Sequence, residues 1–262
     1  MARKPPADKG KLSVRSCAGS DDSRRGRVVL SKPVDTWEAL TDDVIACRAC
    51  PRLVAWREQV AREKRRAYRD WDYWGRPVPG FGDRAARLLI VGLAPGAHGS
   101  NRTGRMFTGD SSGDTLYTAL YRAGFANQPA AQHCDDGLRL TDVFITAIAR
   151  CAPPGNRPMA EEIATCRRFL TREWMLMPQV HVVLALGQMA FDGCLRLLRD
   201  VGYRDMPRLR FSHGFHESFS SPAGSRHLIA SYHPSRQNTQ TGRLTPAMLD
   251  DVFSLARTLI AD

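Results

Sequence analysis

The sequence predicts an α/β fold: a three-layer sandwich whose central, mainly parallel four-stranded sheet is flanked by helices. One observation is a set of four short apolar runs of strand length, at 86–95, 140–150, 180–187 and 226–234. Another is that helical patterns alternate with them, at 113–124, 159–176, 188–200 and 245–260. Strands separated by helices of this length pair in parallel, and both faces of such a sheet are covered. A ligand site is then expected beyond the carboxyl ends of the strands.

The chain before the first strand divides into two parts. Residues 1–34 carry Pro, Gly, Ser and many charges with little periodicity, so we expect a flexible basic tail. Helical periodicity begins near Thr36 and breaks around Pro51, and residues 35–262 are expected to form a single domain. Residues 126–137 lack periodicity and are expected to form a surface insertion.

The charge balance indicates a polyanionic partner. The 262 residues include 38 Lys or Arg and 27 Asp or Glu, a net charge of +11, and nucleic acid is the usual partner of such a surplus. A basic but otherwise ordinary surface would give the same total. Basic residues gather after Pro51, where they form either a solvent-exposed helix face or a phosphate-contacting one: Arg57, Arg62, Lys64, Arg65, Arg66 and Arg69.

Nothing in the sequence indicates a membrane segment or a secretory signal. No run of about twenty apolar residues occurs, and the basic N-terminus is not followed by an apolar stretch. We therefore expect a cytoplasmic protein. In that reducing compartment cysteines serve as metal ligands or core residues more often than as disulfides.

Four of the seven cysteines could form a metal site. Cys47 and Cys50 make a CxxC pair, Cys151 begins the loop CAPPGNRP, and Cys166 lies in the helix that follows. Zinc ribbons usually use two short pairs, whereas an iron–sulfur cluster accepts ligands from distant segments. The alternative is that Cys151 and Cys166 are buried as small apolar residues. The remaining cysteines are not expected to be ligands: Cys17, Cys134 and Cys194.

A long glycine-rich loop follows the first strand, with the sequence VGLAPGAHGSNRTGRMFTGDSSGDTL. It lacks the phosphate-loop and dinucleotide-binding patterns, but its backbone could approach a small planar ligand closely. Phe107 is the only aromatic residue in this loop. Such a residue is either a packing plug or, beside a nucleobase, a stacking surface.

Two further loops follow later strands. CAPPGNRP carries Asn156, which is either a hydrogen-bonding amide or an ordinary turn residue. SYHPSRQNTQTGRL follows the last strand, and Pro234 holds the backbone of His233 extended. A His at the carboxyl end of a parallel strand, followed by polar and basic residues, is a candidate for chemistry.

Taken together, these motifs resemble those of the iron–sulfur uracil-DNA glycosylases, and most closely the type-5 family. The resemblance covers about residues 45–250 and rests on five ordered motifs: CRACPRL, GLAPGAHGSNRTGRMFTGD, CAPPGNRP with Cys166, LALG, and YHPSRQNTQTGRL. It implies a small α/β sandwich with a central parallel sheet. It also implies that a [4Fe–4S] cluster with a structural role is held by Cys47, Cys50, Cys151 and Cys166.

The resemblance further implies a DNA repair enzyme that acts on double-stranded DNA containing uracil or other deaminated bases. Phe107 would stack on the flipped base, His233 would hydrogen-bond its carbonyl oxygen, and the segment HPSRQN would wedge into the vacated position. Gly92 and Ala94 are assigned to the base pocket. The family leads us to expect a monomer, associated with the nucleoid. We assign DNA contacts to Ser235, Arg236, Arg157 and Arg105.

Departures from the related type-4 family bear on specificity. Leu93 follows the first Gly of the first motif, where type-4 members have Glu, and Ala147 stands where they place a base-reading Asn. A site with fewer specific amide contacts rejects analogues less strongly. We therefore expect broad base specificity, including hypoxanthine and ethenocytosine.

Hydrolysis of an N-glycosidic bond produces an oxocarbenium-like sugar and an anionic base. We assign His233 as the donor to the leaving base, and Asn101 and Asn156 as the residues that orient water. Asp110 is a weaker candidate, because its position before a helix suits it to capping. The alternative function is a non-catalytic iron–sulfur module that binds DNA lesions, which would not need His233.

Overall fold

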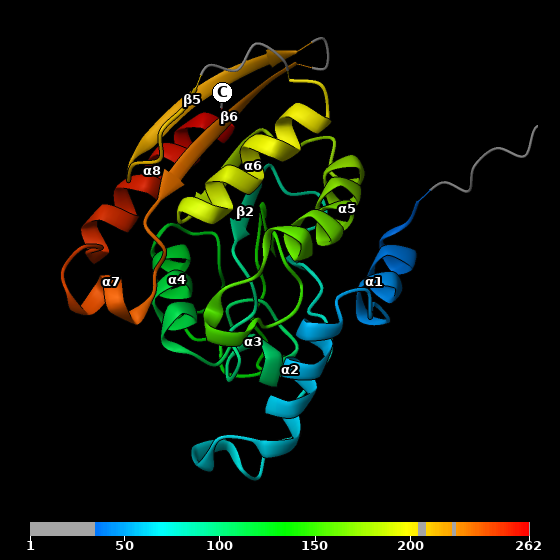
Figure 1. Ribbon diagram of the computed structural model, residues 1–262. Coiled ribbons are helices and arrows are strands. Elements are labelled where there is room, and N and C mark those ends of the chain that lie inside the picture. The colour runs from blue at the N-terminus through cyan, green and yellow to red at the C-terminus, as the bar shows by residue number, and fades with distance from the viewer. Residues whose placement is uncertain (1–34, 204–207, 222–223, 262) are drawn as a thin grey trace, which may run out of the picture. The chain divides into compact units, whose positions relative to one another are not determined.

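The computed structural model describes residues 35–203, 208–221 and 224–261 (Figure 1), and the predicted tail at 1–34 lies outside them. The helices are α1 (Trp37–Ile45), α2 (Pro51–Glu63), α3 (Ser100–Thr103), α4 (Ser111–Arg122), α5 (Ala160–Leu176), α6 (Gln188–Asp200), α7 (Arg236–Gln240) and α8 (Pro246–Ala261), with the 3-10 turns η1 (Arg66–Tyr68) and η2 (Pro154–Asn156). The strands are β1 (Phe81–Gly82), β2 (Leu88–Gly92), β3 (Val143–Ala147), β4 (Val182–Leu186), β5 (Phe215–Ser221) and β6 (Gly224–Ser231). None of the described helices is both long and apolar enough to cross a membrane.

The sheet contains the four predicted strands as its parallel centre. The strand order is β1-β3-β2-β4-β6-β5, and β3, β2, β4 and β6 pair in parallel. The predicted number of strands was wrong, because β1 and β5 add an antiparallel strand at each edge. β1 has only two residues in a Pro- and Gly-rich stretch, and the polar residues of FHESFSS obscure the apolar alternation in β5.

Helices cover both faces of this sheet, as the sequence predicted. Successive side chains of a strand point to opposite faces. On one face, Leu88 and Ile90 of β2 belong to the core that includes residues of α4 and α8. On the other face, Leu89 and Val91 pack with residues of α5 and α6. Figure 1 shows these two helix pairs on opposite sides of the strands, which confirms the three-layer sandwich.

Capping residues fix where the helices begin. The Thr36 hydroxyl accepts a hydrogen bond from the Ala39 amide at 3.1 Å and starts α1. Pro51 occupies the first turn of α2, which accounts for the predicted break. Asp110 caps α4 and Ser235 caps α7. The last two caps lie in the loops that follow β2 and β6, so they hold both loops at the carboxyl edge of the sheet.

Candidate active site

A cavity of about 500 Å³ opens at the carboxyl ends of the parallel strands, where the sequence predicted a ligand site. Its walls come from three loops that lie far apart in the sequence and from the start of α4. They are residues 93–96 after β2, Pro153 and Asn156 after β3, His233 and 235–237 after β6, and 106–107 with 110–112 at α4. Another cavity, of about 220 Å³, lies beneath α1 and contains none of the predicted site residues.

Phe107 enters this cavity from an unusual backbone conformation. Its φ is +51°, in the left-handed region that bulky residues seldom adopt. Two glycines make room for it. A Cβ on Gly113 would lie 1.8 Å from the Phe107 carbonyl oxygen, and a Cβ on Gly92 would lie 2.9 Å from the ring. Gly92 therefore lies behind the ring of Phe107, whereas Ala94 forms part of the cavity wall.

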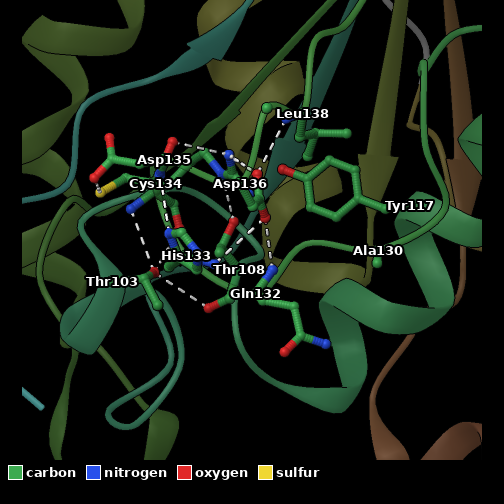
Figure 2. Close-up of polar contacts among 12 residues, drawn as sticks. Thr103, Thr108, Tyr117, Ala130, Gln132, His133, Cys134, Asp135, Asp136 and Leu138 are labelled. Carbon is green, nitrogen blue, oxygen red and sulfur yellow. Dashed lines mark hydrogen bonds and ion pairs between the residues drawn. The ribbon is translucent and has the colours of Figure 1, made fainter.

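Polar contacts on both sides hold the loop that carries Phe107 (Figure 2). Asp136, in the predicted insertion, accepts two hydrogen bonds from Arg105 at 2.8 and 2.7 Å. The Nε of Arg105 donates to the Thr108 hydroxyl at 2.8 Å. Tyr117 of α4 donates to the carbonyl that precedes Phe107, at 2.7 Å. A strained backbone persists only where its surroundings determine it in this way.

Arg105, which the sequence assigned to DNA contact, is 4% exposed and paired with Asp136. Burial alone would raise the pKa of the Asp136 carboxyl, but hydrogen bonds from Arg105 and from the Leu138 and Gln132 amides hold that pKa well below its usual range. The structure thus gives Arg105 a buried, paired position within the loop. The sequence analysis missed Asp136, because an Asp before Gly in a polar insertion is indistinguishable from a turn residue.

His233 follows β6 and is partly buried. Its ring stacks on Phe107, with centroids 5.8 Å apart and planes inclined by 29°. Loss of water around the ring lowers the pKa of His233 to about 4, so the imidazole is uncharged at neutral pH. Asn238 donates to the His233 carbonyl at 2.8 Å and fixes its backbone. Among the described residues the ring nitrogens have no hydrogen-bond partner, so a ligand can use them.

Asp110 combines its capping role with a place in the cavity wall. One carboxyl oxygen, Oδ1, accepts hydrogen bonds from the Ser112 and Gly113 amides at 3.0 and 3.1 Å. The other, Oδ2, faces the loop at Gly99, where a Cβ would lie 1.9 Å from it. Burial raises the pKa of Asp110 above its usual range, although the two amides act in the opposite direction. The cavity therefore contains a carboxyl group with one oxygen free of the cap.

The two asparagines assigned to water lie in different places. Asn156 is exposed at the rim of the cavity, with a φ of +56°. Asn101 is fully buried in α3, and its amide nitrogen donates to the carbonyls of Arg57 and Ala97 at 3.2 and 3.4 Å. The structure brings Asn156 to the cavity and does not bring Asn101.

The cavity wall is apolar at Leu93 and Ala147, the two positions that differ from the type-4 family, and its rim is polar. Leu93 and Ala147 both face the cavity, at the carboxyl ends of β2 and β3. Ser235 and Arg236 line the opening at the start of α7, and Arg236 is exposed. Arg157 is also exposed and directly follows η2. These three polar residues are in positions that an approaching macromolecule can reach, unlike Arg105.

The four cysteines predicted as ligands line one small cavity. Cys47 and Cys50 lie between α1 and α2, Cys151 follows β3, and Cys166 belongs to α5. Burial raises the pKa of Cys151 to about 11 and that of Cys166 to about 12. Within the described ranges no three Cys, His, Asp or Glu side chains are grouped closely enough for a single metal ion. In a four-iron cluster each cysteine binds a separate iron, so its ligands are spaced farther apart.

Hydrogen-bond donors surround these sulfur atoms. Arg57, which is 1% exposed, donates from Nη1 to the Cys151 Sγ at 2.9 Å. The Arg150 backbone amide donates to the Cys166 Sγ at 3.3 Å. The Nε of Arg57 and the Nε and Nη1 of Arg150 are buried without a partner. The cavity thus offers cationic donors to sulfur in otherwise apolar surroundings that include Leu53, Val54 and Phe169.

The Asp136 contact gives a prediction for stability. Asp136→Ala should lower the free energy of unfolding by about 3–5 kcal/mol, because it leaves the buried Arg105 charge unpaired. Since the folded-state pKa of Asp136 is lowered, its contribution is present at neutral pH and is lost as the pH falls below the ordinary Asp range. Chemical denaturation at several pH values measures both effects. The exposed neighbour is the control: Asp135→Ala should change stability by less than about 0.5 kcal/mol, and equal losses would contradict the assignment.

Comparison with known proteins agrees with this geometry. A family model of the uracil DNA glycosylase superfamily matches residues 79–257. A type-5 uracil-DNA glycosylase of Mycobacterium leprae is 55% identical over 221 residues, which cover 84% of this chain and 94% of that protein. Its counterpart from Thermus thermophilus is 53% identical, over 85% of this chain and 97% of that protein.

More distant similarity extends to the type-4 proteins. A type-4 uracil-DNA glycosylase of Sulfurisphaera tokodaii is 29% identical over 153 residues, which cover 58% of this chain and 55% of that protein. The higher identity and wider coverage both favour the type-5 group. The chain belongs to the uracil-DNA glycosylase superfamily and, within it, to the type-5 family.

Proposed function

We propose that this chain is a DNA repair glycosylase that receives flipped uracil from double-stranded DNA, hydrolyses its N-glycosidic bond and leaves an abasic site. One observation carries the proposal. A stacking ring (Phe107), an uncharged donor (His233) and a carboxyl group (Asp110) converge in a single cavity at the carboxyl edge of the sheet. Its volume of about 500 Å³ lies in the range of small-ligand sites.

His233 is proposed to donate a hydrogen bond to the carbonyl oxygen of the leaving base. Negative charge develops on that oxygen as the glycosidic bond breaks, and a preorganised donor lowers the barrier. Because the pKa of His233 is lowered to about 4, the donor is a neutral imidazole at pH 7. Phe107 would stack on the base and hold its plane beside this donor.

Asp110 is proposed to position the attacking water, with Asn156 as a second contact at the rim. The Oδ2 of Asp110 is outside the helix cap and can accept a hydrogen bond from water when the carboxyl group is ionised. The same negative charge would stabilise the developing sugar cation. Asp110 therefore takes precedence over Asn101, whose amide is committed to backbone carbonyls outside the cavity.

The apolar part of the wall supports a broad choice of base. Leu93, Ala94 and Ala147 offer no polar side-chain atoms to the base edge. A pocket excludes an analogue strongly only where the analogue leaves buried polar groups unpaired. We infer that hypoxanthine and ethenocytosine are accepted along with uracil. Flipping costs a few kcal/mol, and phosphate contacts by Arg236 and Arg157 would offset part of that cost.

We propose that Cys47, Cys50, Cys151 and Cys166 hold a [4Fe–4S] cluster. Their fit rests on one apolar cavity lined by all four sulfurs and on the unpartnered guanidinium N–H groups beside it. Bound there, the cluster would supply a structural cross-link among the α1–α2 turn, the loop after β3 and α5. Since burial raises the pKa of Cys151 and Cys166, binding must displace their protons.

The first test is excision from a labelled duplex that carries one U·G pair. Alkali treatment after incubation should cleave the strand at an abasic site. A parallel duplex with hypoxanthine should be cut at a single-turnover rate within about 200-fold of that for uracil, because apolar contacts discriminate by only about 10–200-fold. Tight, salt-sensitive binding with both strands intact would instead favour a non-catalytic lesion-binding module. Strict uracil preference would contradict the breadth inferred from the wall.

The donor role predicts the effect of His233→Ala. Its single-turnover rate should fall by about 10²–10³-fold, the usual effect of removing one preorganised donor, while affinity for the damaged duplex persists. His133→Ala, in the exposed insertion, is the control and should keep the normal rate. Near-normal excision by His233→Ala would refute the role.

The role of Asp110 predicts an acid limb in the pH–rate profile. The ionised carboxylate is the stronger acceptor for water, and only it carries the negative charge that would stabilise the sugar cation, so the rate should fall as the pH drops through the pKa of Asp110. Burial raises that pKa, which places the limb above the ordinary Asp value of about 3.9. Asp110→Asn should preserve the cap, lower the rate and abolish this limb. Asp114→Asn, one turn further along α4, should retain it; persistence of the limb in Asp110→Asn would contradict the assignment.

The metal assignment predicts loss of colour and iron. Cys151→Ser and Cys166→Ser should bind less iron and acid-labile sulfide, lose visible absorption, and melt at a lower temperature than the parent protein. Cys134→Ser, an exposed cysteine of the insertion, should retain all three properties. Equal iron content in the three variants would exclude Cys151 and Cys166 as ligands.

A further inference from the structure

A basic segment that the site does not use follows α2. It comprises residues 64–76 and contains η1. Figure 1 shows it at the lower end of the view, beyond α2 and α3. Within residues 64–76 the sequence has five Arg or Lys and two Asp or Glu. The segment is therefore a local source of positive charge near the loops that form the cavity.

One buried arginine fixes this segment to the cavity loop. The guanidinium of Arg102, in α3, lies 3.9 Å from the ring centroid of Tyr68 and 4.0 Å from that of Trp71. Arg102 is 3% exposed and also donates to the carbonyls of His98 and Gly109, at 2.8 Å each. Cation–π contacts of a desolvated arginine are among the stronger ones. The basic segment is thus joined to the glycine-rich loop from inside.

Backbone contacts reinforce this junction. The Trp74 and Gly75 amides donate to the carbonyls of Arg102 and Asn101, at 2.9 and 3.0 Å. The Tyr73 hydroxyl lies 3.1 Å from Nδ1 of His98, in the loop that forms one wall of the cavity. Asn101, which does not reach the cavity, therefore serves as an anchor for the segment. A surface held this firmly loses little conformational entropy when it binds.

The outward-facing cations of the segment are left without acidic partners. Arg65, Arg66 and Arg69 are exposed, and within the described part of the chain none of them forms an ion pair. The nearby acids Asp70 and Asp72 are exposed as well and do not pair with them. Other surface arginines do have carboxylate partners: Arg48, Arg84, Arg122 and Arg172. Single unpaired arginines also occur elsewhere on the described surface, such as Arg139 and Arg196, but the segment gathers three of them within five residues.

We propose that the basic segment is a second DNA-contact surface, which binds phosphates of the duplex beside the flipped nucleotide without reading its sequence. The occupant is DNA because the available groups are unpaired guanidinium cations on a backbone that is anchored to the loop that would hold the base. Phosphate contacts fix the register of a protein on a duplex and carry no sequence information themselves. This inference rests on the proposed function, and it adds a surface formed by residues other than those of α7.

The test compares two triple variants of the full chain with equal net charge. One replaces the segment's cations: Arg65→Gln, Arg66→Gln and Arg69→Gln. The control replaces three exposed arginines that lie outside the segment and the cavity wall: Arg139→Gln, Arg196→Gln and Arg199→Gln. Affinity for an undamaged duplex is measured over a range of salt concentrations, and the single-turnover excision rate at saturating enzyme is measured on a U·G duplex.

The segment variant should bind undamaged duplex more weakly. Its slope of log K against log salt should become shallower by about 0.9 for each phosphate that the protein no longer neutralises. The control should keep the parental slope, and excision at saturating enzyme should match the parent in both. Equal slopes in the two variants, or a parental slope in the segment variant, would overturn the proposal. If the triple variant does not fold, Arg66→Gln and Arg69→Gln alone test the same change of slope.

These outcomes separate the surface from the proposed activity. A parent protein that excised nothing would refute the glycosylase, while the binding slopes would still decide whether the basic segment contacts DNA. The segment variant could instead keep its affinity for DNA and lose binding to an acidic polypeptide such as polyglutamate. That result would assign the surface to a protein partner and overturn the DNA proposal.

Discussion

The left-handed backbone of Phe107 is the constraint on which the rest of the site depends. A bulky residue at φ +51° needs space and restraint together. Gly113 supplies space beneath the carbonyl, and the Asp136–Arg105 pair supplies restraint from an insertion distant in sequence. Because Phe107 stacks on His233, the loops after β2 and β6 are coupled through these two rings. The geometry of the cavity is therefore set by polar contacts outside it.

The cysteine cavity lies where the N-terminal helices contact the rest of the domain. Cys47 and Cys50 precede α2, whose Arg57 reaches the Cys151 sulfur after β3. The carbonyl of the same arginine accepts a hydrogen bond from Asn101 in α3. The cysteines and the base cavity are thus joined through α2 and α3, although neither contributes a residue to the other.

Periodicity was sufficient to predict the parallel centre of the sheet, since β2 and β4 are uninterrupted apolar runs and β3 and β6 each contain a shorter one. The edge strands β1 and β5 were not predicted, because the residues of an edge strand need not be apolar on both faces of the sheet. The motif order placed His233, Phe107 and Ala94 in one cavity, but the same motif contains Asn101 and Arg105, which are buried behind it. The sequence shows that such residues belong to a motif. Whether each of them faces the ligand or supports the loop depends on how the loop packs.

The uncharged state of His233 also affects what happens after bond cleavage. An imidazolium would form an ion pair with the departing base anion, and a buried ion pair separates slowly. A neutral imidazole stabilises the same anion by a single hydrogen bond, which water or a proton can replace. In the proposed role, the burial that lowers the pKa of His233 to about 4 would trade some lowering of the barrier for easier escape of the free base.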